Sequence, residues 1–245
     1  YKRQVLYRSH NIHEIANREF DLVVCAGAPA QKWLANRDPL GDAKKINSLM
    51  HHLRTIQCKT FILISTVDVF KDPMGVNEST PVTEIGLHAY GLHRMMLEQF
   101  VTQQFSNFLI VRLPGLVGPG LRKNVIFDFL NDNNLQTLDH RGIFQFYPMV
   151  NLWFDIKKAL EFGLSLLHLT AAPISVAEVA LQGFNKPFMQ SLPHTPAHYD
   201  MQTLHAHIFG ASGHYQYSRR ESIQAIRAYA QSEPLTLDGS NGVIL

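Results

Sequence analysis

Three side chains able to hold an oxygen atom or move a proton lie near one another in this sequence. Thr66 ends an apolar run, and Tyr90 and Arg94 stand four residues apart at the start of a helical pattern. Side chains at this spacing project from the same face of a helix. A free tyrosine titrates near ~10, and a neighbouring positive charge favours its ionised form. We therefore expect proton transfer to or from an oxygen atom that the Thr66 hydroxyl holds in place.

Arg94 both supports and restricts this chemistry. Its guanidinium favours tyrosinate and can donate to hydroxyl groups, but it does not lose a proton, so a relay through this cation is closed. An alternative is that Tyr90 is a buried structural residue and that Arg94 pairs at the surface with Glu98, at helical spacing. His93, one residue off the same stripe, is expected to be solvated.

Strands that alternate with amphipathic helices must position these side chains. The continuously apolar residues 22–25 are typical of a strand buried on both faces, and residues 39–57 and 88–104 each carry an apolar helical face. This alternation predicts an α/β fold, a Rossmann-like doubly wound parallel sheet, with ligands beyond the carboxyl ends of its strands. The expected strands are residues 5–7, 21–26, 60–65, 108–112 and 166–169.

Composition excludes several classes of protein. The 245 residues, 46% of them hydrophobic and 17% charged, describe a soluble globular protein. A net charge of +2 gives no support for a nucleic-acid partner, and no apolar run approaches the roughly 20 residues that span a bilayer. Cys25 and Cys58 have no disulfide or metal spacing, so no metal site is expected, and a reducing cytoplasm fits best.

Four short motifs, in a fixed order, give the chain a resemblance to a known family. They are CAGA at residues 25–28, STVDVF at 65–70, Tyr90 with its cation, and RLPGLVGPG at 112–120. With these, the sequence resembles the extended short-chain dehydrogenase/reductases, the NAD-dependent epimerase/dehydratase family that acts on nucleotide sugars. The resemblance covers roughly residues 5 to 185.

The resemblance implies a role for each catalytic candidate. Thr66 would hydrogen-bond the reacting oxygen of the substrate, and Tyr90 would be the general acid/base. Arg94, which stands where the family has lysine, would hold the nicotinamide ribose and lower the pKa of Tyr90. Asp68 would abstract a sugar C–H proton, as acidic residues do in the family's dehydratases; the alternative is that it caps a turn at the strand end.

The resemblance also implies a site for NADP or NAD. Arg8 and Ser9, at the end of the expected first strand, suit a 2′-phosphate and so favour NADP, although Arg8 is equally interpreted as a solvated residue. Gly27 would let the backbone approach the cofactor, or would be an ordinary turn glycine. The implied cofactor-binding residues are Arg8, Ser9, Cys25, Ala26, Gly27, Ser65, Tyr90, Arg94 and Pro114.

The start of the chain departs from the family pattern. The family opens with a strand and a glycine-rich turn, where a helix N-terminus binds the pyrophosphate. Nothing before Gly27 is glycine, and residues 1–7 correspond to the family's second strand. We therefore expect the first βα unit, on the order of 20 to 30 residues, to be absent before Tyr1.

The domain organisation follows from the same pattern. Residues 1–115 are expected to form the Rossmann-like dinucleotide-binding domain, to which residues 145–170 return. Residues 116–144 and 171–245 would form a smaller substrate-binding lobe, and by resemblance a homodimer would form through helices 39–57 and 88–104. In this lobe three residues would hold substrate phosphates, the alternative being solvated side chains: Arg122, Lys123 and Asn124.

The expected function is an NAD(P)-dependent epimerase, dehydratase or reductase acting on a nucleotide-linked sugar. Arginine at position 94 motivates an alternative, a non-catalytic NAD(P)-binding protein with a regulatory or scaffold role. The fold alone does not choose between them, because this scaffold serves many functions.

Overall fold

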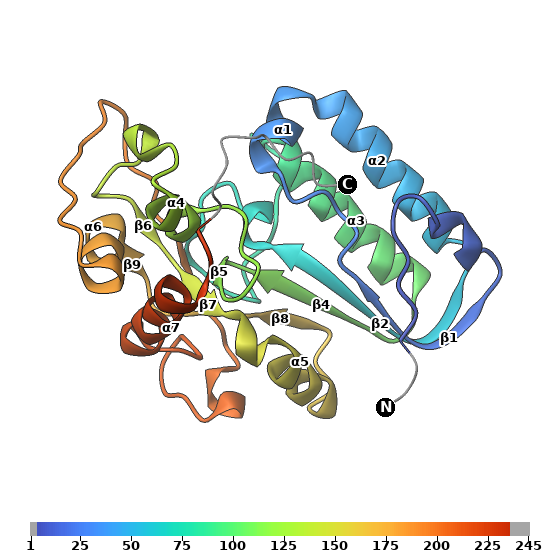
Figure 1. Ribbon diagram of the computed structural model, residues 1–245. Coiled ribbons are helices and arrows are strands. Elements are labelled where there is room, and N and C mark those ends of the chain that lie inside the picture. The colour runs from blue at the N-terminus through green and yellow to red at the C-terminus, as the bar shows by residue number, and fades with distance from the viewer. Residues whose placement is uncertain (1–3, 236–245) are drawn as a thin grey trace.

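A parallel sheet lies at the centre of the protein, whose computed structural model describes residues 4–235 (Figure 1). Its strands are β1 (Glu19–Cys25), β2 (Gln57–Thr66), β4 (Phe108–Leu113) and β8 (Leu166–His168), in the order β1-β2-β4-β8. Leu63 pairs with Cys25 on one side and with Ile110 on the other. The carboxyl ends of β1, β2 and β4 therefore meet at one edge of the sheet.

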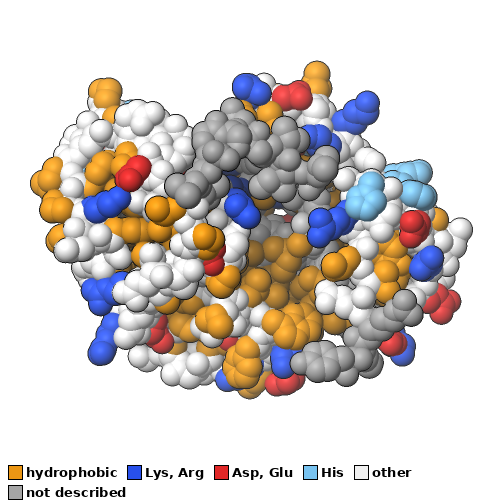
Figure 2. All heavy atoms as spheres, viewed as in Figure 1, with side chains coloured by type: hydrophobic (Ala, Val, Ile, Leu, Met, Phe, Trp, Pro, Cys, Tyr) orange, Lys and Arg blue, Asp and Glu red, His pale blue; other side chains and the backbone are white. Residues whose placement is uncertain are grey.

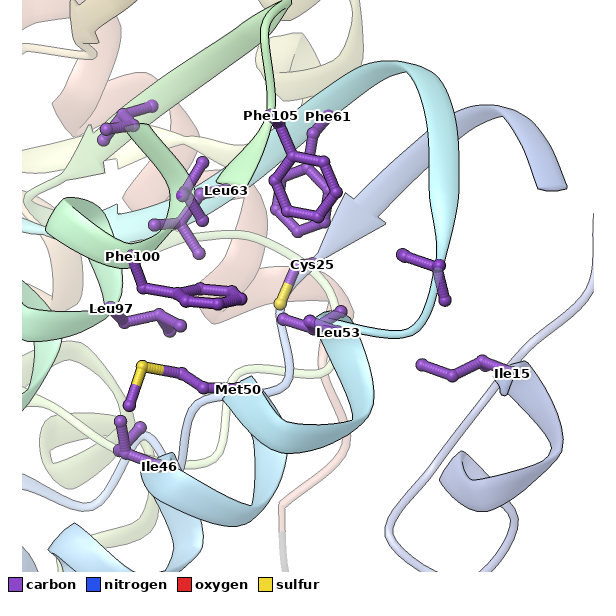
Figure 3. Packing of buried hydrophobic residues seen from close by; sticks show 13 residues of the cluster. Ile15, Cys25, Ile46, Met50, Leu53, Phe61, Leu63, Leu97, Phe100 and Phe105 are labelled. Atoms are coloured by element: carbon purple, nitrogen blue, oxygen red, sulfur yellow. The ribbon is translucent and has the colours of Figure 1, made fainter. Parts of the chain in front are cut away.

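Helices cover both faces of this sheet, as Figure 1 shows, and this confirms the Rossmann-like doubly wound prediction. On one face pack α2 (Pro39–Leu53) and α3 (Ala89–Gln104), and on the other packs α5 (Leu152–Glu161). The helix expected over residues 39–57 thus ends four residues earlier. Figure 3 shows the first of these cores, in which Phe61 stacks on Phe105 with 4.1 Å between ring centroids.

The strand expected over residues 5–7 is absent, so that prediction is wrong. The backbone N–H of Arg8 donates to the side chain of Asn11, and the backbone N–H of Asn11 donates back to the Arg8 carbonyl. Asparagine side chains stabilise turns in this way. The turn leads into a 3-10 helix, Ile12–Ile15. Arg8 and Ser9 are exposed and follow no strand, so the argument that placed NADP beside them loses its structural basis.

β1 is also less buried than expected. Leu22 and Val24 are 40% and 47% exposed, whereas Cys25 is buried in the core beneath α2. Successive residues of a strand point to opposite faces. The face that carries Leu22 and Val24 lies at the outer strand of the sheet and outside the core that α5 covers. Burial on both faces is therefore wrong for this strand.

A second core lies beside the sheet and joins segments from residue 117 onward, among them Phe129, Phe146 and Ile226. In Figure 1 the helices of this part lie on the left, and Figure 2 shows hydrophobic side chains at the centre of the same face. The division of the chain at residue 115 stays a prediction. The elements are β5 (Gly115–Val117), α4 (Val125–Asn131), β6 (Ile143–Phe144), β7 (Phe146–Pro148), β9 (Ile174–Ser175), α6 (Val176–Glu178) and α7 (Arg219–Ser232).

Three short elements complete the sites at the sheet edge. They are α1 (Lys32–Arg37) and the paired strands β3 (Met74–Val76) and β10 (Asp200–Met201). Residues 115–117 pair with β7 as strand β5. Within residues 4–235 no helix has the length and apolar character needed to cross a bilayer.

Candidate active site

Thr66 is fixed at the carboxyl end of β2 by its own hydrogen bond. Its hydroxyl accepts from the backbone N–H of Asp68 at 3.1 Å and so caps the 3-10 helix Val67–Val69. This turn carries the Asp68 side chain, which is partly exposed, to the same edge of the sheet. Thr66 and Asp68 thus both take part in this turn. The Thr66 side chain also lies beside Tyr90, and the Asp68 side chain also contacts Lys32 and Tyr199.

Three features fix the start of α3. The ring of His88 accepts from the backbone N–H of Gly91 at 3.0 Å, and the backbone N–H of Tyr90 donates to Asn36 at 3.0 Å. A Cβ atom on Gly91 would overlap the carbonyl oxygen of Asp68. Glycine at position 91 therefore allows α3 to approach the turn and brings Tyr90 to Thr66.

We expect Gly91→Ala to push the start of α3 away from this turn. Overpacking of this kind costs roughly 1–3 kcal/mol of the free energy of unfolding, measurable by urea denaturation. Gly27→Ala is the matched control, because a Cβ atom there meets Leu49 at an ordinary 3.5 Å. Equal stability of the two variants would contradict the close approach at Gly91.

Tyr90 lies beside Thr66, close enough for the Thr66 side chain to influence the phenol. Burial raises the pKa of Tyr90 above its ordinary value, and the Asp68 carboxylate raises it further. Arg94, Thr66 and Lys32 act in the opposite direction without reversing the shift. The expected lowering by the cation is therefore present but outweighed. At neutral pH Tyr90 keeps its proton, and it is suited to donate that proton to a substrate oxygen beside Thr66.

Arg94 lies over the face of the Tyr90 ring, 4.0 Å from its centroid, and is only 3% exposed. Its guanidinium donates to the carboxylate of Asp42 and to the carbonyl of Pro29. Asp42 also contacts the ring of His93 at 2.7 Å. Although burial alone would raise it, hydrogen bonds from Arg94 and His93 hold the pKa of Asp42 below its ordinary value.

This cluster corrects two expectations. His93 is buried rather than solvated, because its ring pairs with Asp42. Arg94 does not pair with Glu98, which instead binds Arg112 at 2.7 Å. Because the Arg94 guanidinium is buried and held by Asp42, it is poorly placed to donate to hydroxyl groups of a ligand as the resemblance implied.

The candidate cofactor-binding residues fall into two groups. Cys25 ends β1, Ala26 and Gly27 follow it, and Pro114 follows β4, so these residues share the carboxyl edge with Thr66. The Cys25 thiol is buried, which raises its pKa. The second group consists of Ser65, Arg8 and Ser9. The Ser65 hydroxyl donates to Glu98 within the protein, and Arg8 and Ser9 lie in their turn, apart from this edge.

The segment that joins β1 to α1 does not form a phosphate cradle. It holds a single glycine, Gly27, and leads into a helix of six residues. The Pro29 carbonyl accepts a hydrogen bond from Arg94, and the Ala30 carbonyl accepts one from Lys123. This segment therefore presents carbonyl oxygens to the site, whereas a phosphate needs N–H donors. The residues at this edge therefore fit the acid/base end of a dinucleotide site but not its pyrophosphate end.

The three candidate substrate residues separate in space. Lys123 reaches the Ala30 carbonyl across the site, and burial lowers its pKa while Asp68 raises it. Asn124 instead caps α4, accepting from the backbone N–H of Ile126 at 2.9 Å. Arg122 lines a separate cavity of about 240 Å³ near Tyr229. Of the three, the structure brings Lys123 to Asp68.

Two residues that sequence analysis missed complete the site. The ammonium of Lys32 lies 2.6 Å from the Asp68 carboxylate, and the Tyr199 hydroxyl lies 3.1 Å from both. Lys32 comes shortly after the motif at residues 25–28, so the sequence indicated that it lies near this edge. Tyr199 had none, because it comes from an irregular segment 131 residues away from Asp68.

Comparison with known proteins identifies the fold. No protein-family model matches the sequence, and no curated protein matches it. Among solved structures, an NAD-dependent NDP-hexosamine 5,6-dehydratase of tunicamycin biosynthesis has 19% identity and a TM-score of 0.66, with 88% of this chain and 78% of that chain covered. A dTDP-4-dehydrorhamnose reductase from Bacillus anthracis, in complex with NADP, has 17% identity and a TM-score of 0.65 over 85% and 79%.

A UDP-galactose 4-epimerase is similar too, with 17% identity, a TM-score of 0.62, and 86% of this chain and 76% of that chain covered. At these identities the likeness establishes the fold. The fold is thus one that nucleotide-sugar dehydratases, reductases and epimerases share.

Proposed function

We propose that this chain is an NAD(P)-dependent enzyme that epimerises, dehydrates or reduces a nucleotide-linked sugar. The observation that carries the proposal is the position of the Tyr90 phenol beside Thr66 at the carboxyl edge of the parallel sheet. Ligands of open α/β sheets bind beyond this edge. Structures of this fold that act on nucleotide sugars support the choice of substrate class.

The proposed chemistry divides among three side chains. Thr66 donates to the sugar oxygen that changes between hydroxyl and ketone, and Tyr90 gives its proton to that oxygen or takes one from it. Asp68 accepts a C–H proton beside the ketone when the reaction is a dehydration, in which a neighbouring sugar hydroxyl leaves as water. The nicotinamide, when bound, exchanges a hydride with the sugar carbon. Arg8 and Ser9, the residues expected beside the adenosine ribose, lie in an exposed turn, so the proposal names NADP and NAD together.

Purified protein mixed with NAD+, NADP+, NADH or NADPH, and then with UDP-galactose or dTDP-linked sugars, tests this function. We expect nicotinamide fluorescence to change on binding and the sugar to be converted, with cofactor consumption if the reaction is a reduction. Binding of either dinucleotide without conversion of any sugar would favour the regulatory or scaffold alternative. Absence of both binding and conversion would contradict the proposal.

Two further parts of the proposal concern assembly and place. A homodimer would form through α2 and α3, and light scattering of the purified protein measures its mass. A cytoplasmic place is proposed from the sequence alone, and fluorescence microscopy of the tagged protein tests it.

A further inference from the structure

The site needs a positive charge that a ligand can reach, and Arg94 does not supply it. Its guanidinium stacks on the face of the Tyr90 ring and is neutralised by the buried carboxylate of Asp42. The Arg94 side chain is also only 3% exposed, so that a ligand does not reach it. A cation that acts on the reacting groups must therefore come from another element.

Lys32 on α1 has the position that such a cation requires. Its ammonium bonds the Asp68 carboxylate at 2.6 Å and the Tyr199 hydroxyl at 3.1 Å. These three groups form one hydrogen-bonded set, since Tyr199 also bonds Asp68 at 3.1 Å. An ammonium has three N–H donors, so two are used here and one is left. The Lys32 side chain is 38% exposed, which leaves this donor open to a ligand.

We propose that Lys32 is the ligand-contacting cation of this site. It positions Asp68 and Tyr199 and donates its third N–H to a hydroxyl group of the bound ligand, either the sugar or the nicotinamide ribose. This assignment deepens the proposed function and rests on it for the identity of the ligand. Arg94 then forms a structural ion pair, and the cation that contacts the ligand is Lys32, 62 residues earlier in the chain.

The charges around this set give a readout that needs no turnover. His88 lies with its Nε2 atom 4.0 Å from Asp68, and burial lowers its pKa, as do the charges of Lys32 and Arg94. Asp68 opposes them. The titratable groups facing Lys32, Asp68 and Tyr199 are His88, Tyr90 and Arg94 on or beside α3, and Lys123.

Lys32→Met tests the position of this charge through NMR titration of His88 in the protein without ligands. Loss of the ammonium removes a charge that disfavours imidazolium and leaves Asp68 unneutralised, so the pKa of His88 is expected to rise. Lys32→Arg should keep it near the wild-type value. Lys59→Met is the matched control, because Lys59 pairs with Asp21 in an exposed position. An unchanged His88 titration in Lys32→Met would overturn the assignment.

Calorimetric titration with UDP-glucose and with NADPH separates the two sources of the hydroxyl. Loss of a hydrogen bond from a charged donor weakens binding by roughly 10- to 150-fold. We expect Lys32→Met to weaken one of these two ligands by that factor, Lys32→Arg to restore part of it, and Lys59→Met to bind as wild type. If wild type binds both ligands and Lys32→Met weakens neither, the ligand contact is wrong. If wild type binds neither, the proposed function fails with the ligand contact, while a shifted His88 titration would still support the placement of Lys32.

Discussion

Tyr90→Phe should lower kcat by roughly 10²- to 10⁴-fold, the usual contribution of a positioned general acid or base. Phenylalanine keeps the ring on which Arg94 stacks, so α3 and the Asp42 pair should remain in place. Only the hydroxyl beside Thr66 is lost. Steady-state kinetics with the sugar found to be converted measures the effect, and KM should change much less than kcat because the lost interaction is one of proton transfer.

Tyr229→Phe is the matched control for this experiment. The Tyr229 hydroxyl reaches the carbonyl of Leu121, in the second core rather than at the sheet edge. Its removal should leave kcat close to wild type. If Tyr90→Phe and Tyr229→Phe reacted at equal rates, Tyr90 would have no part in proton transfer and the functional proposal would lose its main support.

Asp42→Asn should lower the free energy of unfolding by roughly 3–5 kcal/mol, because it leaves the buried charge of Arg94 without a partner. A domain is typically stable by only about 5–15 kcal/mol, so the loss is large. Urea denaturation at neutral pH measures it. Arg94 and His93 are both held by this carboxylate, so Tyr90 should also lose its fixed position.

The difference in stability between wild type and Asp42→Asn is expected to depend on pH. The pKa of Asp42 is lower in the folded protein than in the unfolded chain. Its stabilising effect is therefore complete above the ordinary carboxyl pKa near ~4 and is lost as pH falls through the folded value. The difference in stability between wild type and Asp42→Asn should shrink over that acidic range.

A surface pair supplies the contrast. Lys59 and Asp21 lie 2.7 Å apart with side chains 81% and 61% exposed. Lys59→Ala should therefore change stability by no more than about 1 kcal/mol. If Asp42→Asn proved no more destabilising than Lys59→Ala, the cluster at Arg94 would not be the buried ion pair described here.

The sequence predicted the elements that have strong local signals. β2 contains the apolar run at residues 61–64 and ends at a hydroxyl, and α3 has an apolar stripe, so Thr66 and Tyr90 were placed together from pattern and resemblance. Asp42 also had a signal that was missed. It precedes Ile46 and Met50 at four-residue spacing on the buried face of α2, and a carboxylate in that position requires a cation nearby.

Other features depend on contacts that no local pattern records. Tyr199 reaches Asp68 only because the chain returns from the second core to the sheet edge. The exposure of Leu22 and Val24 depends on which helices cover β1, and residues 5–7 are too short a run to separate a strand from a turn. The capping box of Ser175 and Glu178, in contrast, depends on residues that are adjacent in the sequence, so a local pattern is enough to indicate it.

A crystal structure of the chain with NADPH and the sugar nucleotide that it binds tests the central claim most directly. We predict one sugar oxygen within roughly 2.6–3.2 Å of both the Tyr90 hydroxyl and the Thr66 hydroxyl. A sugar bound with its oxygen atoms away from both hydroxyls, or seated at another surface of the protein, would contradict the proposed chemistry.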